Sequence, residues 1–323
     1  MTVPHTEVTA RRTRRTASTI LSAIVASIAV VCAAVWWPRT AWSAPGGDPV
    51  GELQFGGLQR TYVVHAPVGG SKPTGLVVAL HGRGGTGRGE AELTHYSDVA
   101  DAHGFVVVYP DGVDKGWADG RGVSEPDRRG IDDVGFITAL VDKLVHDYGI
   151  DPGHVFATGM SNGGFMANRL GCDRADVFAA IAPVAGTLGV DVACRPARPV
   201  AVMATHGTAD PIVPFDGGTM TGRGGRSDIV SATDLASRWR DLDACPGPPG
   251  ETVLPGGAEG TEVHQFSATE CAAGTAVQFM QVDNGGHTWP GGSQYLPKAV
   301  IGATTHAFDA AEAGWRFFEA HAR

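Results

Sequence analysis

Residues 155–164 read Val-Phe-Ala-Thr-Gly-Met-Ser-Asn-Gly-Gly, and this stretch decides the fold. Its apolar start predicts a buried strand, and residues 165–170 predict a helix. A G-x-S-x-G turn joins them, and its glycines leave room for the backbone to bend sharply. In that context Ser161 lies at the carboxyl edge of a parallel sheet and is a candidate nucleophile. A glycine-rich loop with an idle serine is the alternative interpretation.

Strand-like and helix-like segments alternate through the rest of the chain. The predicted strands are 60–66, 75–81, 105–109, 154–159, 179–184, 200–206 and 276–282. The predicted helices are 94–103, 131–148, 163–171, 228–242 and 305–321. Glycine and proline concentrate in residues 111–130, 214–227 and 246–260, which predicts long surface loops. The pattern indicates the α/β class, with a mostly parallel central sheet flanked by helices in a single domain.

A base and an acid follow Ser161 at suitable places, and a serine hydroxyl needs both to become a strong nucleophile. Asp210 begins the loop after one predicted strand, and His287 lies in a glycine-rich turn after another. The order Ser, Asp, His is that of α/β-hydrolase triads. As alternatives, Asp210 could only form a turn before Pro211, and His206 could be the base. Because His206 lies within its strand, we expect it to be packed and hydrogen-bonded instead.

The loop 81–85 is a candidate oxyanion hole, since a tetrahedral intermediate needs N–H donors for its negative charge. It reads His-Gly-Arg-Gly-Gly and follows a predicted strand. We expect one donor from the backbone of Asn162 and the other from the backbone of Arg83. The loop lacks the Lys-Ser/Thr ending of a phosphate-binding loop and the spacing of a dinucleotide fingerprint. No cofactor is therefore expected.

These motifs together resemble the polyhydroxybutyrate depolymerase and feruloyl esterase-like family of secreted esterases. The segments that carry the resemblance are 80–85, 132–136, 159–164, 206–210 and 286–290. The resemblance implies an α/β-hydrolase fold and metal-free hydrolysis of carboxylic esters. It also implies a catalytic triad of Ser161, Asp210 and His287. It leaves the substrate open, because the family covers phenolic esters, polyesters and short acyl esters.

The expected substrates are soluble phenolic esters of the feruloyl type and short acyl or 3-hydroxyacyl esters. No appended polymer-binding module is visible, which disfavours attack on insoluble polymer. Trp117 and Trp289 lie on predicted loops, and we expect both to bind substrate by stacking at the cleft mouth; packing in the core is the alternative. A polyhydroxyalkanoate depolymerase and an acyltransferase remain alternatives on the same scaffold. Three intact triad residues argue against a non-catalytic binding protein.

The first 44 residues predict a signal peptide or an uncleaved membrane anchor. A basic patch at 11–15 precedes an uncharged, largely apolar run at 16–38. Residues 45–51 are then a linker and 52–323 the catalytic domain, which is secreted or held outside the membrane. Residues 1–44 carry five arginines and one glutamate, so the formal charge of −9 becomes −13 without them. This acidic domain lacks a basic stripe for nucleic acid, and no obligate protein partner is evident.

Four cysteines lie beyond the N-terminal segment, and an even number in an exported chain predicts two disulfides. Three pairings are possible, of which we favour the sequential pairs Cys172–Cys194 and Cys245–Cys271. A zinc site is the alternative, but no C-x-x-C spacing occurs, so no metal is expected.

Overall fold

The computed structural model describes residues 48–67, 72–222, 224–255, 257 and 259–323. The chain divides into two units, 1–40 and 41–323, and only the second contains described residues. The predicted targeting segment 1–44 lies outside the described residues, as do the first three residues of the predicted linker. The first strand begins at Val50, two residues before the boundary expected for the catalytic domain.

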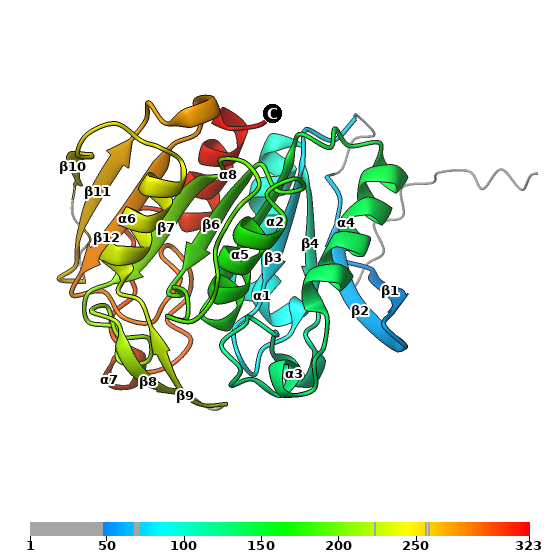
Figure 1. The fold of residues 1–323 in the computed structure, drawn as a ribbon, viewed down its shortest axis with the longest axis horizontal. Coiled ribbons are helices and arrows are strands. Elements are labelled where there is room, and N and C mark those ends of the chain that lie inside the picture. The colour runs from blue at the N-terminus through cyan, green and yellow to red at the C-terminus, as the bar shows by residue number, and fades with distance from the viewer. Residues whose placement is uncertain (1–47, 68–71, 223, 256, 258) are drawn as a thin grey trace, which may run out of the picture. The chain divides into compact units, whose positions relative to one another are not determined.

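A ten-stranded sheet forms the centre of the described unit (Figure 1). In spatial order its strands are β1 (Val50–Phe55), β2 (Leu58–His65), β4 (Val106–Pro110), β3 (Leu76–Leu80), β5 (Val155–Met160), β6 (Ala180–Val184), β7 (Ala201–Gly207), β12 (Val277–Asp283), β11 (Glu262–Ala268) and β10 (Gly250–Leu254). The six strands from β4 to β12 pair in parallel, and the outer pairs are antiparallel. The parallel strands β3 to β7 are buried along their whole length, because helices cover both faces.

Helices cover the two faces of this sheet in separate layers (Figure 1). The helices are α1 (Gly87–Thr94), α2 (Tyr96–His103), α3 (Glu125–Arg128), α4 (Asp133–Tyr148), α5 (Asn162–Asp173), α6 (Ala232–Leu242), α7 (Lys298–Ile301) and α8 (Ala310–Ala320). On one face α4, α5 and α6 supply Leu140, Leu170 and Trp239 to the core. On the other, α2 and α8 supply Tyr96 and Trp315. The α/β fold predicted from the alternating segments is confirmed.

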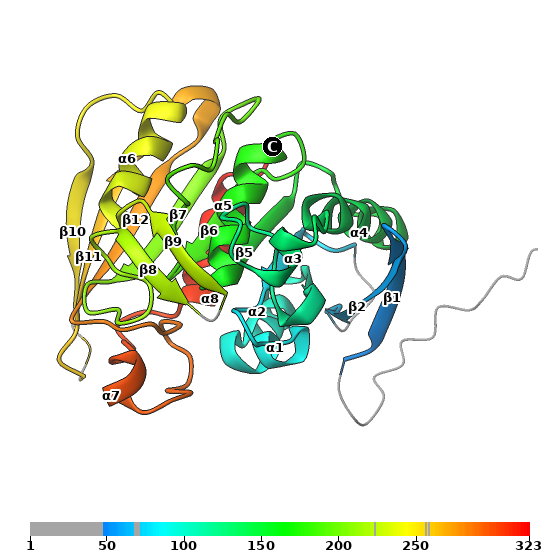
Figure 2. The ribbon, with the colours of Figure 1, turned by 60° about the horizontal axis from the view of Figure 1, so that its bottom comes forward.

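The three glycine- and proline-rich stretches contain more structure than the loops predicted for them. Residues 214–227 hold most of a hairpin, β8 (Gly218–Gly222) and β9 (Gly225–Ile229). The hairpin lies with α3 and α7 beyond one end of the central strands (Figure 1), the end that Figure 2 turns toward the viewer. The predicted helix 228–242 begins only at residue 232, because Ser231 caps it by accepting a hydrogen bond from Asp234 N at 2.9 Å. The glycine and proline content of this stretch predicted a loop. It did not indicate that two of its segments would pair as strands.

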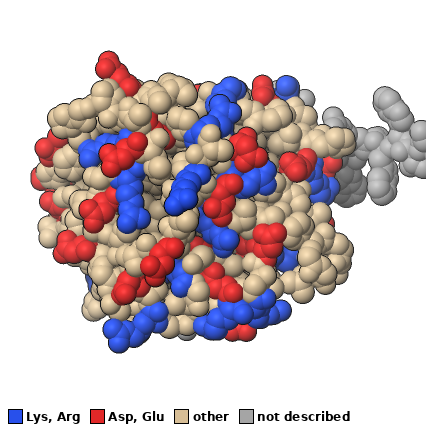
Figure 3. Space-filling view, in the orientation of Figure 1, with Lys and Arg blue, Asp and Glu red and all other residues tan. Residues whose placement is uncertain are grey.

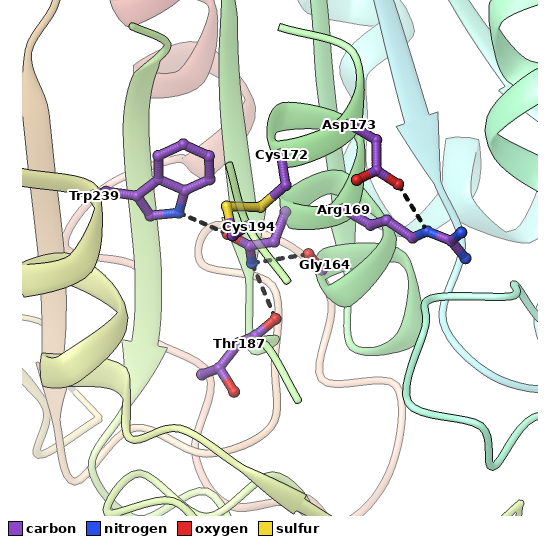
Figure 4. The surroundings of a disulfide bond; sticks show 8 residues. Gly164, Arg169, Cys172, Asp173, Thr187, Cys194 and Trp239 are labelled. Atoms are coloured by element: carbon purple, nitrogen blue, oxygen red, sulfur yellow. Dashed lines mark hydrogen bonds and ion pairs between the residues drawn. A yellow bond between two sulfur atoms is a disulfide. The ribbon is translucent and has the colours of Figure 1, made fainter. Parts of the chain in front are cut away.

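The structure contains both favoured disulfides, Cys172–Cys194 and Cys245–Cys271. Cys172 lies in the last turn of α5, so the first bond ties this helix to the segment after β6 (Figure 4). Beside it, buried Asn168 accepts a hydrogen bond from Trp239 Nε1 at 3.0 Å and donates one to Thr187 O at 3.2 Å. The helix after the candidate nucleophile is therefore held by covalent and polar contacts at once.

The surface in Figure 3 mixes basic and acidic side chains and shows no continuous stripe of either charge. Within the described part of the chain, no helix is both long enough and apolar enough to cross a membrane.

Candidate active site

The turn between β5 and α5 holds Ser161 in a backbone conformation that few side chains adopt. Its φ and ψ are 57° and −120°, and its N–H donates to Val184 O at 2.9 Å. The neighbouring glycines make the turn possible, because a Cβ at Gly163 would lie 1.8 Å from Leu80 O and one at Gly159 would lie 2.5 Å from the same atom. The sharp turn predicted from the G-x-S-x-G pattern is therefore present.

Asp210 and His287 meet after the neighbouring strands β7 and β12. Asp210 Oδ2 lies 2.8 Å from His287 Nδ1, and both side chains are buried. The other carboxylate oxygen accepts hydrogen bonds from the backbone N–H groups of Ile212 and Val213, each at 2.8 Å. These two bonds orient the carboxylate. The carboxylate in turn holds the imidazole through Nδ1, which leaves Nε2 as the ring nitrogen that does not contact Asp210. The Asx-type turn and the contact to histidine occur together, so the two interpretations of Asp210 were not exclusive.

His206, the alternative base, is buried and hydrogen-bonded within the protein. Its Nε2 donates to Val213 O at 2.9 Å and lies 3.7 Å from Asp210 Oδ2. Burial lowers the pKa of His206, which keeps the ring neutral and suits the donated hydrogen bond. The expectation that His206 is packed and hydrogen-bonded is confirmed.

Ser161 and His287 line one cavity of about 530 Å³. Arg83 and Asn162 line it as well, so four of the predicted site residues meet at one place. The apolar part of the lining comes from elements far apart in the sequence: Leu93, Met160, Phe165, Ile212, Met220 and Leu296. The hairpin β8–β9 contributes one wall, which the sequence-based expectation of a loop did not foresee.

The candidate oxyanion loop is held by its own histidine. His81 Nδ1 donates to Gly82 O at 2.8 Å, and Nε2 accepts from Gly112 N at 2.9 Å. Burial lowers the pKa of His81, consistent with the neutral ring that this pairing needs. Among the described residues, no acceptor is present for the backbone N–H of either Arg83 or Asn162. Both N–H groups are free to bind a ligand in the cavity.

Trp117 and Trp289 do not lie at the mouth of the cavity, and that expectation was wrong. Both residues are buried, Trp117 with 0% and Trp289 with 1% of its surface exposed, and neither lines the cavity. Trp117 Nε1 donates to His81 O at 2.9 Å, so this buried side chain helps to hold the candidate oxyanion loop. Trp289 packs edge-on against Tyr96 in the core. The core alternative therefore holds for both residues.

A buried polar network behind the Ser161 turn was missed from the sequence. Asn162 Oδ1 accepts from Trp117 N at 2.8 Å, and Asn162 Nδ2 donates to Asp119 Oδ2 at 2.7 Å. Asp119 also forms an ion pair with Arg121 at 2.6 Å, and Arg121 lies over the Phe165 ring at 3.6 Å. The signal was a Trp-x-Asp-x-Arg pattern inside a stretch that composition assigned to a loop.

One group of side chains in the described residues has the spacing of metal ligands: Glu262, His264 and Asp283. It belongs to the antiparallel strands β11 and β12, and none of the three lines the cavity. Both His264 nitrogens already contact carboxylates, at 2.7 Å to Glu251 and 2.9 Å to Glu262. The surrounding carboxylates raise the pKa of His264, which favours a protonated ring over a metal ligand.

Comparison with solved structures supports the fold. An acetyl xylan esterase from Aspergillus awamori superposes with a TM-score of 0.56 and 15% sequence identity. The superposition covers 84% of this chain and 99% of that protein.

Comparison with known sequences gives the family. A Nocardia uniformis protein named "Putative esterase NocK" is 33% identical over 273 residues, which are 81% of this chain and 79% of that protein. Feruloyl esterase C of Emericella nidulans is 36% identical over 167 residues, and that match covers only 49% of this chain and 58% of the fungal protein. The family model described as "Esterase PHB depolymerase" matches residues 60–283. The chain therefore belongs to the polyhydroxybutyrate depolymerase and feruloyl esterase-like family of esterases.

Proposed function

We propose that this protein is an exported serine carboxylesterase that acts on phenolic and short acyl or 3-hydroxyacyl esters. The observation that carries the proposal is the shared cavity of Ser161 and His287, with Asp210 hydrogen-bonded to the far side of the imidazole. Residues 52–323 would form the catalytic domain. If the whole of β1 is included, the domain begins at Val50.

In the first step Ser161 Oγ attacks the ester carbonyl carbon, and His287 Nε2 takes the hydroxyl proton. Asp210 stabilises the imidazolium that forms and keeps its Nδ1–H pointed at the carboxylate. The protonated Nε2 then gives its proton to the leaving alcohol oxygen as the C–O bond breaks. In the second step His287 Nε2 takes a proton from water, whose oxygen attacks the acyl carbon. The imidazolium then returns that proton to Ser161 Oγ as the bond from the acyl carbon to Oγ breaks and the acid leaves.

The negative charge on the carbonyl oxygen needs donors during both steps. The backbone N–H groups of Asn162 and Arg83 border the cavity without protein acceptors, which makes them the proposed oxyanion hole. Asn162 is the first residue of α5, so the positive end of the helix dipole supports the same charge. The supporting bonds from His81 and Trp117 hold the loop in place before substrate arrives.

The apolar lining of the cavity favours an acyl group that is uncharged, and its volume suits a small or medium ester. The named activity of one relative, feruloyl esterase, lies within this range. Two disulfides support a location outside the cytoplasm, where such bonds persist. We therefore retain the proposal that residues 1–44 direct export, as a signal peptide or an anchor.

Labelling with a fluorophosphonate probe tests the nucleophile, because only an activated serine reacts. The mass of the probe is expected on the peptide that contains Ser161, and Ser161→Ala should abolish both labelling and hydrolysis. Ser267→Ala is a matched control, since that serine lies on β11 away from the cavity. Normal hydrolysis by a folded Ser161→Ala variant would disprove the proposal.

A substrate panel then separates the alternatives. Methyl ferulate, a p-nitrophenyl ester series and a polyhydroxybutyrate film are compared, with product analysis in the presence of added alcohol. We expect turnover of the soluble esters and little erosion of the film. Fast erosion with inert soluble esters would favour a polymer depolymerase, and transfer to alcohol in preference to water would favour an acyltransferase.

A further inference from the structure

Glu90 is a carboxyl group inside the cavity that the proposed mechanism does not use. It lies on α1, its residue is 3% exposed, and it lines the same cavity as Ser161 and His287. Among the described residues its side chain has no hydrogen-bond or ion-pair partner, and its Oε1 is fully buried. Buried polar groups are rarely left unpaired, because an unpaired buried group lowers the free energy of unfolding.

Local contacts hold Glu90 rigidly at this place. Asp111 Oδ1 accepts from Gly87 N at 2.8 Å, and Thr86 Oγ1 accepts from Gly89 N at 3.1 Å, so the first turn of α1 is anchored at both ends. One turn later, Thr94 Oγ1 donates to Glu90 O at 2.8 Å. A side chain on so fixed a backbone is well suited to recognise a ligand group with defined geometry.

The environment of Glu90 favours its neutral form. Burial raises the pKa of its carboxyl well above the ordinary value, and no cation compensates a negative charge there. A protonated carboxyl has one O–H donor and an acceptor oxygen beside it. A hydroxyl group is the simplest ligand with the same two functions, whereas an apolar acyl chain would leave the carboxyl unpaired.

We propose that Glu90 is a specificity-determining residue that forms a hydrogen bond with a hydroxyl group of the ester substrate. The inference deepens the proposed esterase function and rests on it. A phenolic hydroxyl, an acyl-chain hydroxyl and a free hydroxyl on the alcohol part share this chemistry. The proposal therefore concerns the hydroxyl, and the experiment identifies which part of the substrate carries it.

The test compares kcat/KM for three pairs of esters that differ in one hydroxyl. The pairs are p-nitrophenyl 3-hydroxybutyrate with p-nitrophenyl butyrate, methyl p-coumarate with methyl cinnamate, and 2-hydroxyethyl butyrate with ethyl butyrate. Each pair is measured on the parent enzyme, Glu90→Leu and Glu90→Gln. Glu92→Leu is the matched control, because Glu92 lies on the same helix but is exposed and outside the cavity.

The parent enzyme is expected to favour the hydroxyl-bearing ester in at least one pair. Glu90→Leu should reduce that preference, measured as the ratio of the two kcat/KM values, about tenfold or more, as expected for one lost hydrogen bond. Glu90→Gln keeps a neutral donor and acceptor and should retain most of the preference. Glu92→Leu should behave like the parent.

Three results would overturn the proposal: no hydroxyl preference in any pair, an equal loss for both members of a pair in Glu90→Leu, or a loss in Glu90→Gln as large as in Glu90→Leu. The last would mean that the residue acts through charge. These failures are distinct from failure of the esterase function, because each leaves hydrolysis by the parent enzyme intact. Thermal unfolding of each variant checks that it is folded.

Discussion

The buried ion pair behind the Ser161 turn gives a prediction about how stability is linked to activity. Asp119 contacts Arg121 through both carboxylate oxygens, at 2.6–3.1 Å, and accepts from Asn162 Nδ2 at 2.7 Å. Its side chain is 0% exposed and that of Arg121 is 7% exposed. Asp119→Asn removes the negative charge with almost no change in volume.

The expected loss is about 3–5 kcal/mol of unfolding free energy, since removing one partner leaves a buried charge uncompensated. Asp114→Asn is the matched control, because Asp114 forms an ion pair with Arg83 at 3.0 Å but is 55% exposed. Surface pairs contribute about 0–1 kcal/mol, so this variant should lie close to the parent. The two substitutions are chemically identical and differ in burial.

Urea unfolding followed by tryptophan fluorescence measures the stability of both variants, and hydrolysis of p-nitrophenyl butyrate measures activity. Because the acceptor for Asn162 Nδ2 changes from a charged to a neutral oxygen, this hydrogen bond weakens and kcat should also fall in Asp119→Asn. A stability change below about 1 kcal/mol in Asp119→Asn, or an equal change in Asp114→Asn, would refute the reasoning, because burial would then not decide the cost.

Further predictions concern the triad, Glu90 and a disulfide. Ser161→Ala and His287→Ala should each lower kcat by several orders of magnitude with unchanged circular dichroism, and the double variant should be scarcely worse in steady-state assays, since the residues act as a unit. Glu90→Gln should gain stability relative to the parent as pH rises above 4.5, the ordinary pKa of the group, because the unfolded parent releases a proton that the native carboxyl retains. The gain is at most about 1.4 kcal/mol per pH unit and is measured by urea unfolding at pH 5, 6 and 7; a constant difference would contradict it. Replacing both Cys172 and Cys194 with alanine should cost about 3.4 kcal/mol, worked from their separation of 22 residues, and unfolding under non-reducing conditions checks this. An unchanged unfolding midpoint would contradict the disulfide estimate.

Much of the fold and the candidate triad could be predicted from the sequence, because both depend on local patterns. Apolar runs followed by helix-like segments predict parallel strands, and the carboxyl ends of parallel strands meet at one edge. Ser161, Asp210 and His287 each follow such a strand, so three short patterns were enough to predict a common site. The four cysteines allow three pairings, and the sequential pairing that we favoured is the one that the structure contains.

Burial, in contrast, was decided by tertiary structure. Trp117 and Trp289 lie in glycine-rich stretches that resemble cleft loops, yet both are packed in the interior. Glu90 belongs to a short helix of low apolar content and would be assigned to the surface from its neighbours in sequence. The cavity that it lines is completed by residues more than a hundred positions away, the β8–β9 hairpin and the segment before α7 among them. Local sequence determines where a chain bends and which edge its side chains reach, whereas exposure to water depends on which distant segments pack around each side chain.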